Sequence, residues 1–276
     1  RRQRQMCIRD SIRIKWSNFM KKSKKTLEQV MTEQYDLLCR SIARYGKSNL
    51  LEEMNFIRPD NNGLNMLNPY SLKVFANIFC QRFYDLTLCK SDVRVLSATL
   101  IDDEFDFGSK KGKFKVNKAK RKFKEILNGL DYIGNVTFAM YRNEKKSLDE
   151  GYLRSVHCHF LLLSPISRKR REEISSLVHM DENKGIPLYI KEYSLQEAVE
   201  YIWHAPFPAY ASIPNKSKCT VEQMKVKPTL KSLYGLYINH KPSKIYDWTI
   251  AGGKGLDVWN SIKDELEASI EESEDA

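Results

Sequence analysis

A pair of histidines inside an apolar run constrains this chain more than any other feature of its sequence. The segment 156–160 has the sequence VHCHF and belongs to an apolar run that ends at Leu163. Side chains of a strand alternate between its two faces, so the pattern predicts a strand with His157 and His159 together on one face. Neutral imidazole is the commonest protein ligand for metal ions, and two such rings can converge on one ion. Two histidines at this spacing also occur by chance, as polar surface residues of a sheet.

Strand and helix patterns alternate from Val93 onward, in the order strand, helix, strand, strand, helix, strand, helix. Such an order predicts the α+β class, with an antiparallel sheet that carries helices on one face and leaves the other face open for chemistry. The expected strands are 93–101, 132–141, 154–163 and 186–193, and the expected helices are 115–130, 167–180 and one that opens at Ser194.

The remaining chain divides into three parts. Residues 12–90 have helical periodicity, with apolar residues recurring from Leu27 to Ile42 and a second helix expected from Pro69, and nothing there has catalytic spacing. Residues 1–11 resemble the translation of a sequencing adapter and are left out of the fold, the alternative being a natural basic arm that binds DNA. The mixed strand and helix region is assigned to 91–212, and 213–276 is expected to be a mixed or helical extension with an acidic tail.

The helix that opens at Ser194 carries a tyrosine. Ser194 followed by Glu197 is a capping-box pattern, which predicts where the helix begins. Tyr201 lies beside the apolar stripe of this helix, and His204, three residues further along, is expected on the same flank. A tyrosine at such a position is commonly only a half-buried packing residue. The stripe itself is expected to face the sheet and consists of Leu195, Ala198, Val199 and Ile202.

Composition restricts the class of protein. The 276 residues are 42% hydrophobic, which supports a core, and their net charge of +11 favours a polyanionic partner such as nucleic acid. No apolar segment is long enough to span a bilayer and no secretory signal is visible, so we expect a cytoplasmic protein. The six cysteines are scattered without a Cys-x-x-Cys pair, which indicates neither a zinc ribbon nor a disulfide framework.

Positive charge is concentrated in two clusters. One follows the first expected strand and has Phe114 and Phe123 interleaved, and the other, Arg168–Arg171, opens the helix after the histidine strand. Basic residues that neutralise phosphates beside aromatic rings that stack on bases favour contact with single-stranded DNA. Solvated helix faces would explain the same charges. The first cluster consists of Lys110, Lys111, Lys113, Lys115, Lys118, Lys120, Arg121, Lys122 and Lys124.

Taken together, the motifs resemble those of the HUH endonuclease superfamily, and among them the rolling-circle replication initiator (Rep) proteins of plasmids and single-stranded DNA phages. The resemblance covers roughly Val93 to Pro206. The segment 93–102 (VRVLSATLID) is similar to the first motif, 156–160 (VHCHF) to the second, and 200–205 (EYIWHA) to the third, which in the family is a tyrosine followed at i+3 by lysine.

Three positions depart from the family pattern. Cys158 stands between the histidines where the family generally has a bulkier apolar residue. His204 stands where the family usually has lysine, which makes the charge there dependent on pH. Ala205 occupies the position at which the two-tyrosine subgroup has its second tyrosine, so a single nucleophile is expected.

The resemblance implies that 91–212 is a nuclease domain that nicks single-stranded DNA sequence-specifically and transfers strands through a covalent 5′-phosphotyrosine. It implies that His157 and His159 hold Mg²⁺ or Mn²⁺, that Tyr201 is the nucleophile and that His204 and the ion supply positive charge beside it. Glu144 and Glu197 are both open as the third metal ligand.

The partner that the resemblance implies is single-stranded DNA at a replication origin. The glycine-rich segment 252–255 lacks the spacing of a nucleotide-binding loop, so no fused helicase is expected. Unwinding and synthesis would then need a host helicase and polymerase. Two alternatives stay open. A transposase or a conjugative relaxase would use the same chemistry on other DNA, and a non-catalytic nucleic-acid-binding module with a sheet like that of RNA-recognition motifs would carry the histidines incidentally.

Overall fold

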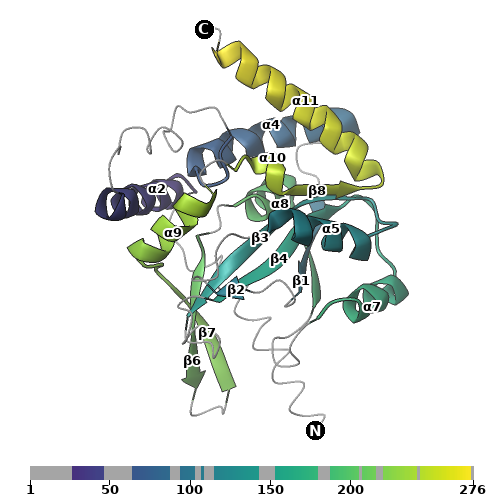
Figure 1. The fold of residues 1–276 in the computed structure, drawn as a ribbon. Coiled ribbons are helices and arrows are strands. Elements are labelled where there is room, and N and C mark those ends of the chain that lie inside the picture. The colour runs from purple at the N-terminus through teal and green to yellow at the C-terminus, as the bar shows by residue number, and fades with distance from the viewer. Residues whose placement is uncertain are drawn as a thin grey trace.

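The fold is described from a computed structural model, in which a curled sheet lies below a layer of helices (Figure 1). The stretch 1–11, the basic residues Lys110, Lys111 and Lys113, and Glu144 lie outside the described residues, so the predictions made for them have no structural counterpart here. The structure describes residues 27–46, 64–87, 94–102, 107–108, 115–142, 153–179, 187–204, 207–215, 220–240 and 243–274.

One mostly antiparallel sheet organises the molecule. Its strands follow the order β5-β1-β4-β3-β6-β7, while β2 pairs with β4 and β8 pairs with β3. The histidine strand β4 therefore lies inside the sheet, antiparallel to both β1 and β3, and among the described pairs only that of β3 with β6 is parallel. The strands are β1 (Arg94–Ile101), β2 (Phe107–Gly108), β3 (Tyr132–Arg142), β4 (Leu153–Leu162), β5 (Leu188–Ser194), β6 (Ala209–Asn215), β7 (Thr220–Val226) and β8 (Thr249–Gly252).

The predicted α+β class is confirmed at the level of a mixed fold with a largely antiparallel sheet. The four predicted strands are β1, β3, β4 and β5, and the three helices predicted among them are α5, α7 and α8, each with ends shifted by a few residues. The helices are α2 (Leu27–Tyr45), α4 (Pro69–Thr87), α5 (Val116–Ile126), α7 (Arg168–Ser176), α8 (Leu195–Ile202), α9 (Leu230–His240), α10 (Ile245–Trp248) and α11 (Lys254–Glu274).

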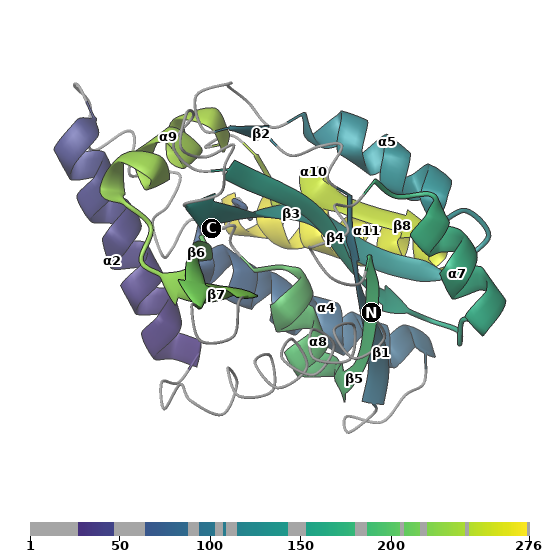
Figure 2. The same ribbon diagram turned by 90° about the horizontal axis from the view of Figure 1, so that it is seen from below.

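Helices lie against both faces of the sheet, which differs from the expectation of a single covered face. Tyr201 of α8 contacts His159, whereas Trp248 of α10 packs on Phe138, whose side chain points to the opposite face, at a ring separation of 5.9 Å. Figure 2 shows α8 on one side of the strands and α7 on the other. The reason is that the histidine face also carries apolar residues, among them the fully buried Ile133, which need cover.

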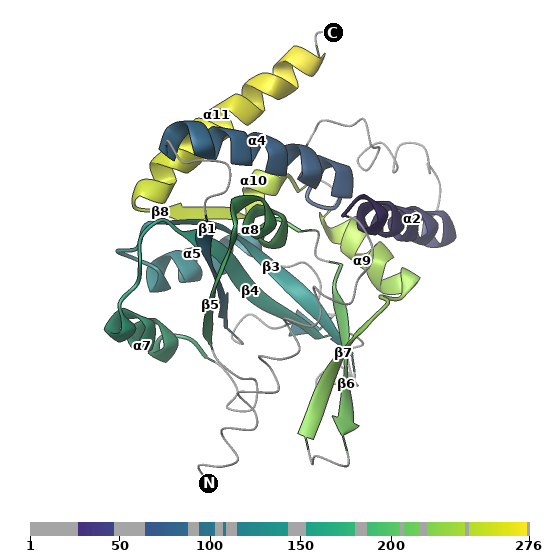
Figure 3. The same ribbon diagram turned by 180° about the vertical axis from the view of Figure 1, so that it is seen from behind.

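Helices α4 and α11 form a layer in which α4 packs on α8, and α2 continues this layer beside α9 (Figures 1 and 3). Phe75 and Phe79 of α4 are fully buried and pack on Trp203, with ring centroids 5.3 and 4.6 Å away. Arg82 of α4 pairs with Glu265 of α11 at 2.8 Å. Residues far apart in the sequence therefore hold α8 in place from above.

The C-terminal extension contributes to the same sheet. The boundary expected between 212 and 213 falls inside β6, and β8 pairs with β3 in register with Thr249 opposite Asn135. The β6–β7 hairpin extends away from the helical layer (Figure 3). In the part of the chain that the structure describes, no helix combines the length and the apolar character needed to cross a membrane.

Strands β3 and β4 approach each other closely at Gly134. A Cβ atom at this position would collide with the carbonyl oxygen of His159 and with the side chain of Phe160. Only glycine fits without moving the neighbouring backbone, because it has no Cβ. Gly134 therefore helps to set the distance between the histidine strand and the polar residue that follows it, Asn135.

Candidate active site

Strand β4 presents both histidines on one face, as its alternating pattern predicts. The centroids of the His157 and His159 rings are 4.6 Å apart. His159 lies opposite Thr99 of β1 and Asn135 of β3, and directly opposed residues of antiparallel strands project to the same face. His159 is therefore flanked by polar residues of both neighbouring strands, whereas His157 lies between Thr137 of β3 and the apolar Ile101 of β1.

Helix α8 brings a tyrosine onto this face. The capping box between Ser194 and Glu197 is present, and the four residues of the predicted apolar stripe are buried. The ring of Tyr201 lies 4.5 Å from the ring of His159, centroid to centroid. The structure thus brings the tyrosine next to the histidine pair, two motifs that the family resemblance implies belong to one site.

His204 also lies near these side chains, although it is not part of helix α8 as the sequence pattern predicts. Helix α8 ends at Ile202 and Trp203 is its C-cap, so His204 is not on the helix flank. Its ring is nevertheless 5.6 Å from that of His159 and 6.2 Å from that of Tyr201. The helix ends early because Trp203 turns into the aromatic cluster of α4 and donates a hydrogen bond to Thr249 at 3.1 Å.

Hydrogen bonds orient the three imidazoles alike. Nδ1 of His157 donates to the carbonyl of Ser155 at 3.2 Å, and Nδ1 of His204 donates to the carbonyl of Tyr201 at 2.7 Å. Nδ1 of His159 is hydrogen bonded to the hydroxyl of Thr99 at 2.8 Å. In each ring the Nδ1 atom is engaged and Nε2 is left as the nitrogen for a metal or a proton. Metal-binding histidines are commonly oriented by such a bond to the second nitrogen.

Burial determines the protonation of these groups. It lowers the pKa of His157 to about 4, with a further contribution from His204, and it lowers the pKa of His159 well below the ordinary value. It also lowers the pKa of His204, helped by Lys225. The three rings are therefore neutral at neutral pH, which is the form that binds metals. The positive charge expected from His204 is absent at that pH.

Tyr201 has the opposite shift. Burial raises the pKa of its hydroxyl well above the ordinary value, and the neighbouring Tyr193, Tyr210 and Tyr189 add to this effect. The hydroxyl of Thr99 lies 3.5 Å from that of Tyr201 and stabilises the phenolate slightly. Thr99 thus links the tyrosine to His159, and the tyrosine is protonated until a base or a cation acts on it.

Two buried oxygen atoms on β3, opposite the histidines, have no hydrogen-bond partner among the described residues. Asn135 and Thr137 are fully buried on β3, directly opposite His159 and His157. No described group forms a hydrogen bond with Asn135 Oδ1 or Thr137 Oγ1, although the Asn135 amide donates to the carbonyl of Ile202 at 3.3 Å. A buried oxygen that lacks a hydrogen-bond partner or a metal ion lowers the free energy of unfolding. An ion held by the imidazoles would supply one.

The carboxylates considered as third ligand do not meet this donor set within the described residues. Glu197 is exposed and its carboxylate accepts hydrogen bonds from the backbone and the hydroxyl of Ser194. Glu144 lies outside the described residues. Among the described residues, no group of three or more histidine, cysteine, aspartate or glutamate side chains is arranged to hold an ion. Amide oxygens are not part of that set, so its absence does not bear on Asn135.

Sequence reasoning missed Thr99, Asn135 and Thr137. The signal was present, because all three are polar residues inside strands that consist mostly of apolar residues. Alternation places each of them on one face of its own strand, but it does not say which face of one strand matches which face of another. The pairing register supplies that information.

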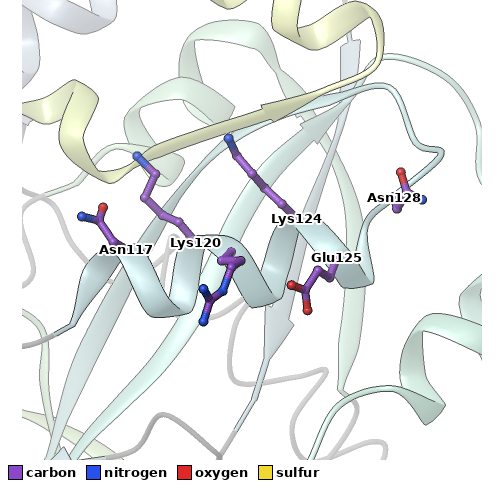
Figure 4. A pocket seen from close by; sticks show the side chains of 6 residues that line it. Asn117, Lys120, Lys124, Glu125 and Asn128 are labelled. Atoms are coloured by element: carbon purple, nitrogen blue, oxygen red, sulfur yellow. The ribbon is translucent and has the colours of Figure 1, made fainter.

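The described basic residues of the two clusters lie on the other side of the sheet from the histidines. Lys120 of α5 donates to the carbonyl of Asp247 in α10 at 2.7 Å, and Arg170 of α7 donates to the carbonyls of Ile126 and Asn128 at the end of α5. Figure 4 shows the shallow open depression along α5, with Lys120 and Lys124 directed toward α10 and β8. Any DNA bound there is separated from Tyr201 by the sheet.

The chain was compared with protein-family models, with curated proteins and with solved structures. No family model, no curated protein and no solved structure matches it. The assignment of function therefore depends on the chemistry of the residues that meet around Tyr201.

Proposed function

We propose that this protein is a metal-dependent HUH endonuclease and DNA strand transferase that initiates rolling-circle replication by nicking single-stranded DNA at an origin. The observation that carries the proposal is the proximity of the Tyr201 phenol to two neutral imidazoles on one sheet face. The ring of Tyr201 is 4.5 Å from that of His159, and Thr99 lies within hydrogen-bonding reach of both side chains.

His157 and His159 would hold the metal ion, with Asn135 Oδ1 as an oxygen ligand. When bound, the ion would polarise the scissile phosphate and neutralise the charge that develops on it. Two nitrogen donors favour Mn²⁺ over Mg²⁺, because Mg²⁺ strongly prefers oxygen ligands. Thr99 would act as a positioning residue, since its bond to Nδ1 of His159 directs Nε2 away from β1.

Tyr201 would be the nucleophile. Its oxygen attacks the phosphorus atom, the bond between phosphorus and the 3′-oxygen breaks, and that oxygen takes up a proton to become a free 3′-hydroxyl. The 5′-phosphate remains on Tyr201, and the reverse reaction rejoins strands without a nucleotide cofactor. The proton of the phenol needs an acceptor, because burial raises the pKa of Tyr201. Neutral His204, whose Nδ1 is engaged, would accept it through Nε2.

The test is the covalent adduct itself. The protein is incubated with Mn²⁺ and a pool of single-stranded oligonucleotides, and intact mass spectrometry should detect protein carrying a 5′-linked fragment. Tyr201→Phe should lose the adduct completely while retaining DNA binding. The matched control is Tyr193→Phe, which removes the hydroxyl of the tyrosine stacked on Tyr201 and should retain the adduct. An unchanged adduct in Tyr201→Phe would refute the role of Tyr201.

A non-catalytic nucleic-acid-binding module is the second candidate. It is favoured by Tyr189 and Tyr193 of β5, which share the face of Thr99 and His159, because exposed rings on a sheet can stack on bases. If this candidate is right, the protein should bind single-stranded DNA or RNA but form no covalent adduct, whichever divalent metal ion is added. A transposase or a relaxase would form the same adduct on different DNA, so the sequence of the captured fragment distinguishes these from a replication initiator.

A further inference from the structure

The edge strand β5 directs an alternating row of tyrosine and lysine toward the candidate active site. Tyr189 lies opposite Thr99 of β1, and Thr99 lies opposite His159. Opposed residues share a face, so Tyr189 projects to the histidine face, and the period of two adds Lys191 and Tyr193. The three side chains are on the outermost strand on that side of the sheet.

This row is continuous with the proposed nucleophile. The ring of Tyr193 lies 5.9 Å from that of Tyr201, with the two planes 25° apart. The ammonium of Lys191 lies 4.4 Å from the centroid of the Tyr193 ring. Tyr189, further along the strand, has 38% of its surface exposed. The row therefore begins at Tyr201 and ends in solvent.

The opposite side of the site repeats the pattern. Tyr141 of β3 and Tyr210 of β6 stack at 5.4 Å and 25°, and Lys225 of β7 lies opposite Tyr210. Tyr141 lies four residues after Thr137 on β3 and shares its alternation, so this pair also lies on the histidine face. Aromatic and basic side chains thus lie on the histidine face on both sides of β4. Tyr189 is level with His159 in the strand register, whereas Tyr141 lies opposite Leu153, further along the sheet.

Single-stranded nucleic acid matches this chemistry. Aromatic rings stack on any base and a lysine between them pairs with the backbone phosphate. Tyrosine and lysine on an edge strand also favour strand formation and discourage pairing with another chain. Protection of the sheet edge does not require these three side chains to lie on the same face as Tyr201. All three lie on that face, which favours a role in binding.

We propose that Tyr189, Lys191 and Tyr193 form a nucleobase-binding track that holds single-stranded DNA next to the scissile phosphate. The track rests on the proposed function for the location of that phosphate, but not for its ability to bind DNA. The two rings would each stack on a base, and Lys191 would contact the phosphate between them.

Fluorescence anisotropy of a labelled oligothymidine tests the track, with EDTA present so that metal-dependent cleavage cannot occur. Tyr189→Ala should weaken binding about five- to 150-fold, the range expected for the loss of one base stack. Tyr189→Phe keeps the ring and should bind like the unchanged protein. Tyr45→Ala is the control, because Tyr45 of α2 is 36% exposed but lies outside the sheet, and it should have no effect.

Salt dependence tests the lysine separately. Lys191→Ala should reduce the slope of log Kd against log salt by about 0.7, the value for one neutralised phosphate on a single strand. Three results would overturn the proposal. Tyr189→Ala could bind oligothymidine with wild-type affinity, the unchanged protein could fail to bind it, or the unchanged protein could prefer oligouridine to oligothymidine. The adduct experiment is independent: binding that needs Tyr189 without any adduct would refute the nickase and keep the track.

Discussion

The two faces of the sheet are built by the same three central strands and have opposite properties. One face of β4 carries His157 and His159, and the other carries the buried apolar residues Val156, Cys158 and Phe160. Tyr201 lies against the first face, while the basic helices α5 and α7 lie beyond the second. The densest positive charge of the described chain is therefore not beside the candidate chemistry.

The difference has an energetic side. On the histidine face, Asn135 and Thr137 are fully buried with oxygen atoms that no described group satisfies, and each such atom costs about 1–3 kcal/mol. On the other face, each large buried apolar side chain contributes about 1.5–3 kcal/mol. The packed face stabilises the fold, and that stability offsets the cost of a polar face arranged for binding.

The largest expected effect concerns activity. Replacing both His157 and His159 with alanine should abolish metal-dependent adduct formation, because it removes both nitrogen ligands, and circular dichroism should remain unchanged. The matched variant is His179→Ala, an exposed histidine after α7 that should leave the adduct at its full yield. If the double variant still formed the adduct, the active site could not depend on the histidine face.

The next effect concerns stability. Phe123 of α5 is fully buried. Phe123→Ala should lower the free energy of unfolding by about 3–5 kcal/mol, because it opens a cavity in the packed layer. Urea denaturation measures the change. Tyr201→Phe, which removes one hydroxyl from the other face, should change the same quantity by less than about 1 kcal/mol. Equal losses in the two variants would contradict the division of roles between the faces.

A smaller effect concerns the metal. Asn135→Ala should weaken Mn²⁺ binding about 10- to 100-fold, measured by electron paramagnetic resonance without DNA, because the oxygen donor is removed. Asn135→Asp keeps an oxygen at this position and should bind Mn²⁺ at least as tightly as the unchanged protein. Asn117→Ala on the exposed surface of α5 is the comparison and should have no effect. Undiminished affinity in Asn135→Ala would exclude the amide as a ligand.

The smallest effect concerns the basic helix. Arg121 and Lys124 line the open depression on α5, behind the sheet as seen from Tyr201. Replacing both with alanine should leave the affinity for a short oligonucleotide unchanged and weaken a long one, whose ends can pass around the sheet. The salt slope for the long oligonucleotide should fall by about 0.7 for each phosphate that these two side chains neutralise. If the double variant bound the short oligonucleotide more weakly, the short strand would have to contact α5 and not only the histidine face.

Local patterns predicted much of this architecture. Alternation placed both histidines on one face, and the capping box between Ser194 and Glu197 marked the first turn of α8. Both features depend on residues within a few positions of each other, which is why they can be read from a sequence. The end of α8 could not be predicted in the same way, because Trp203 leaves the helix to pack on Phe79, more than a hundred residues earlier in the chain.

The amino-acid sequence alone specified the periodicity of each strand and helix, and with it which side chains share a face of one element. Which of these faces meet was set by the tertiary structure. His159 follows Thr99 by 60 positions and Tyr201 follows it by 102. The hydroxyl of Thr99 nevertheless lies within hydrogen-bonding reach of both side chains, because β1 pairs with β4 and α8 packs on their shared face. Strand register and helix packing are long-range properties, since they depend on which surfaces bury each other and not on neighbours along the chain.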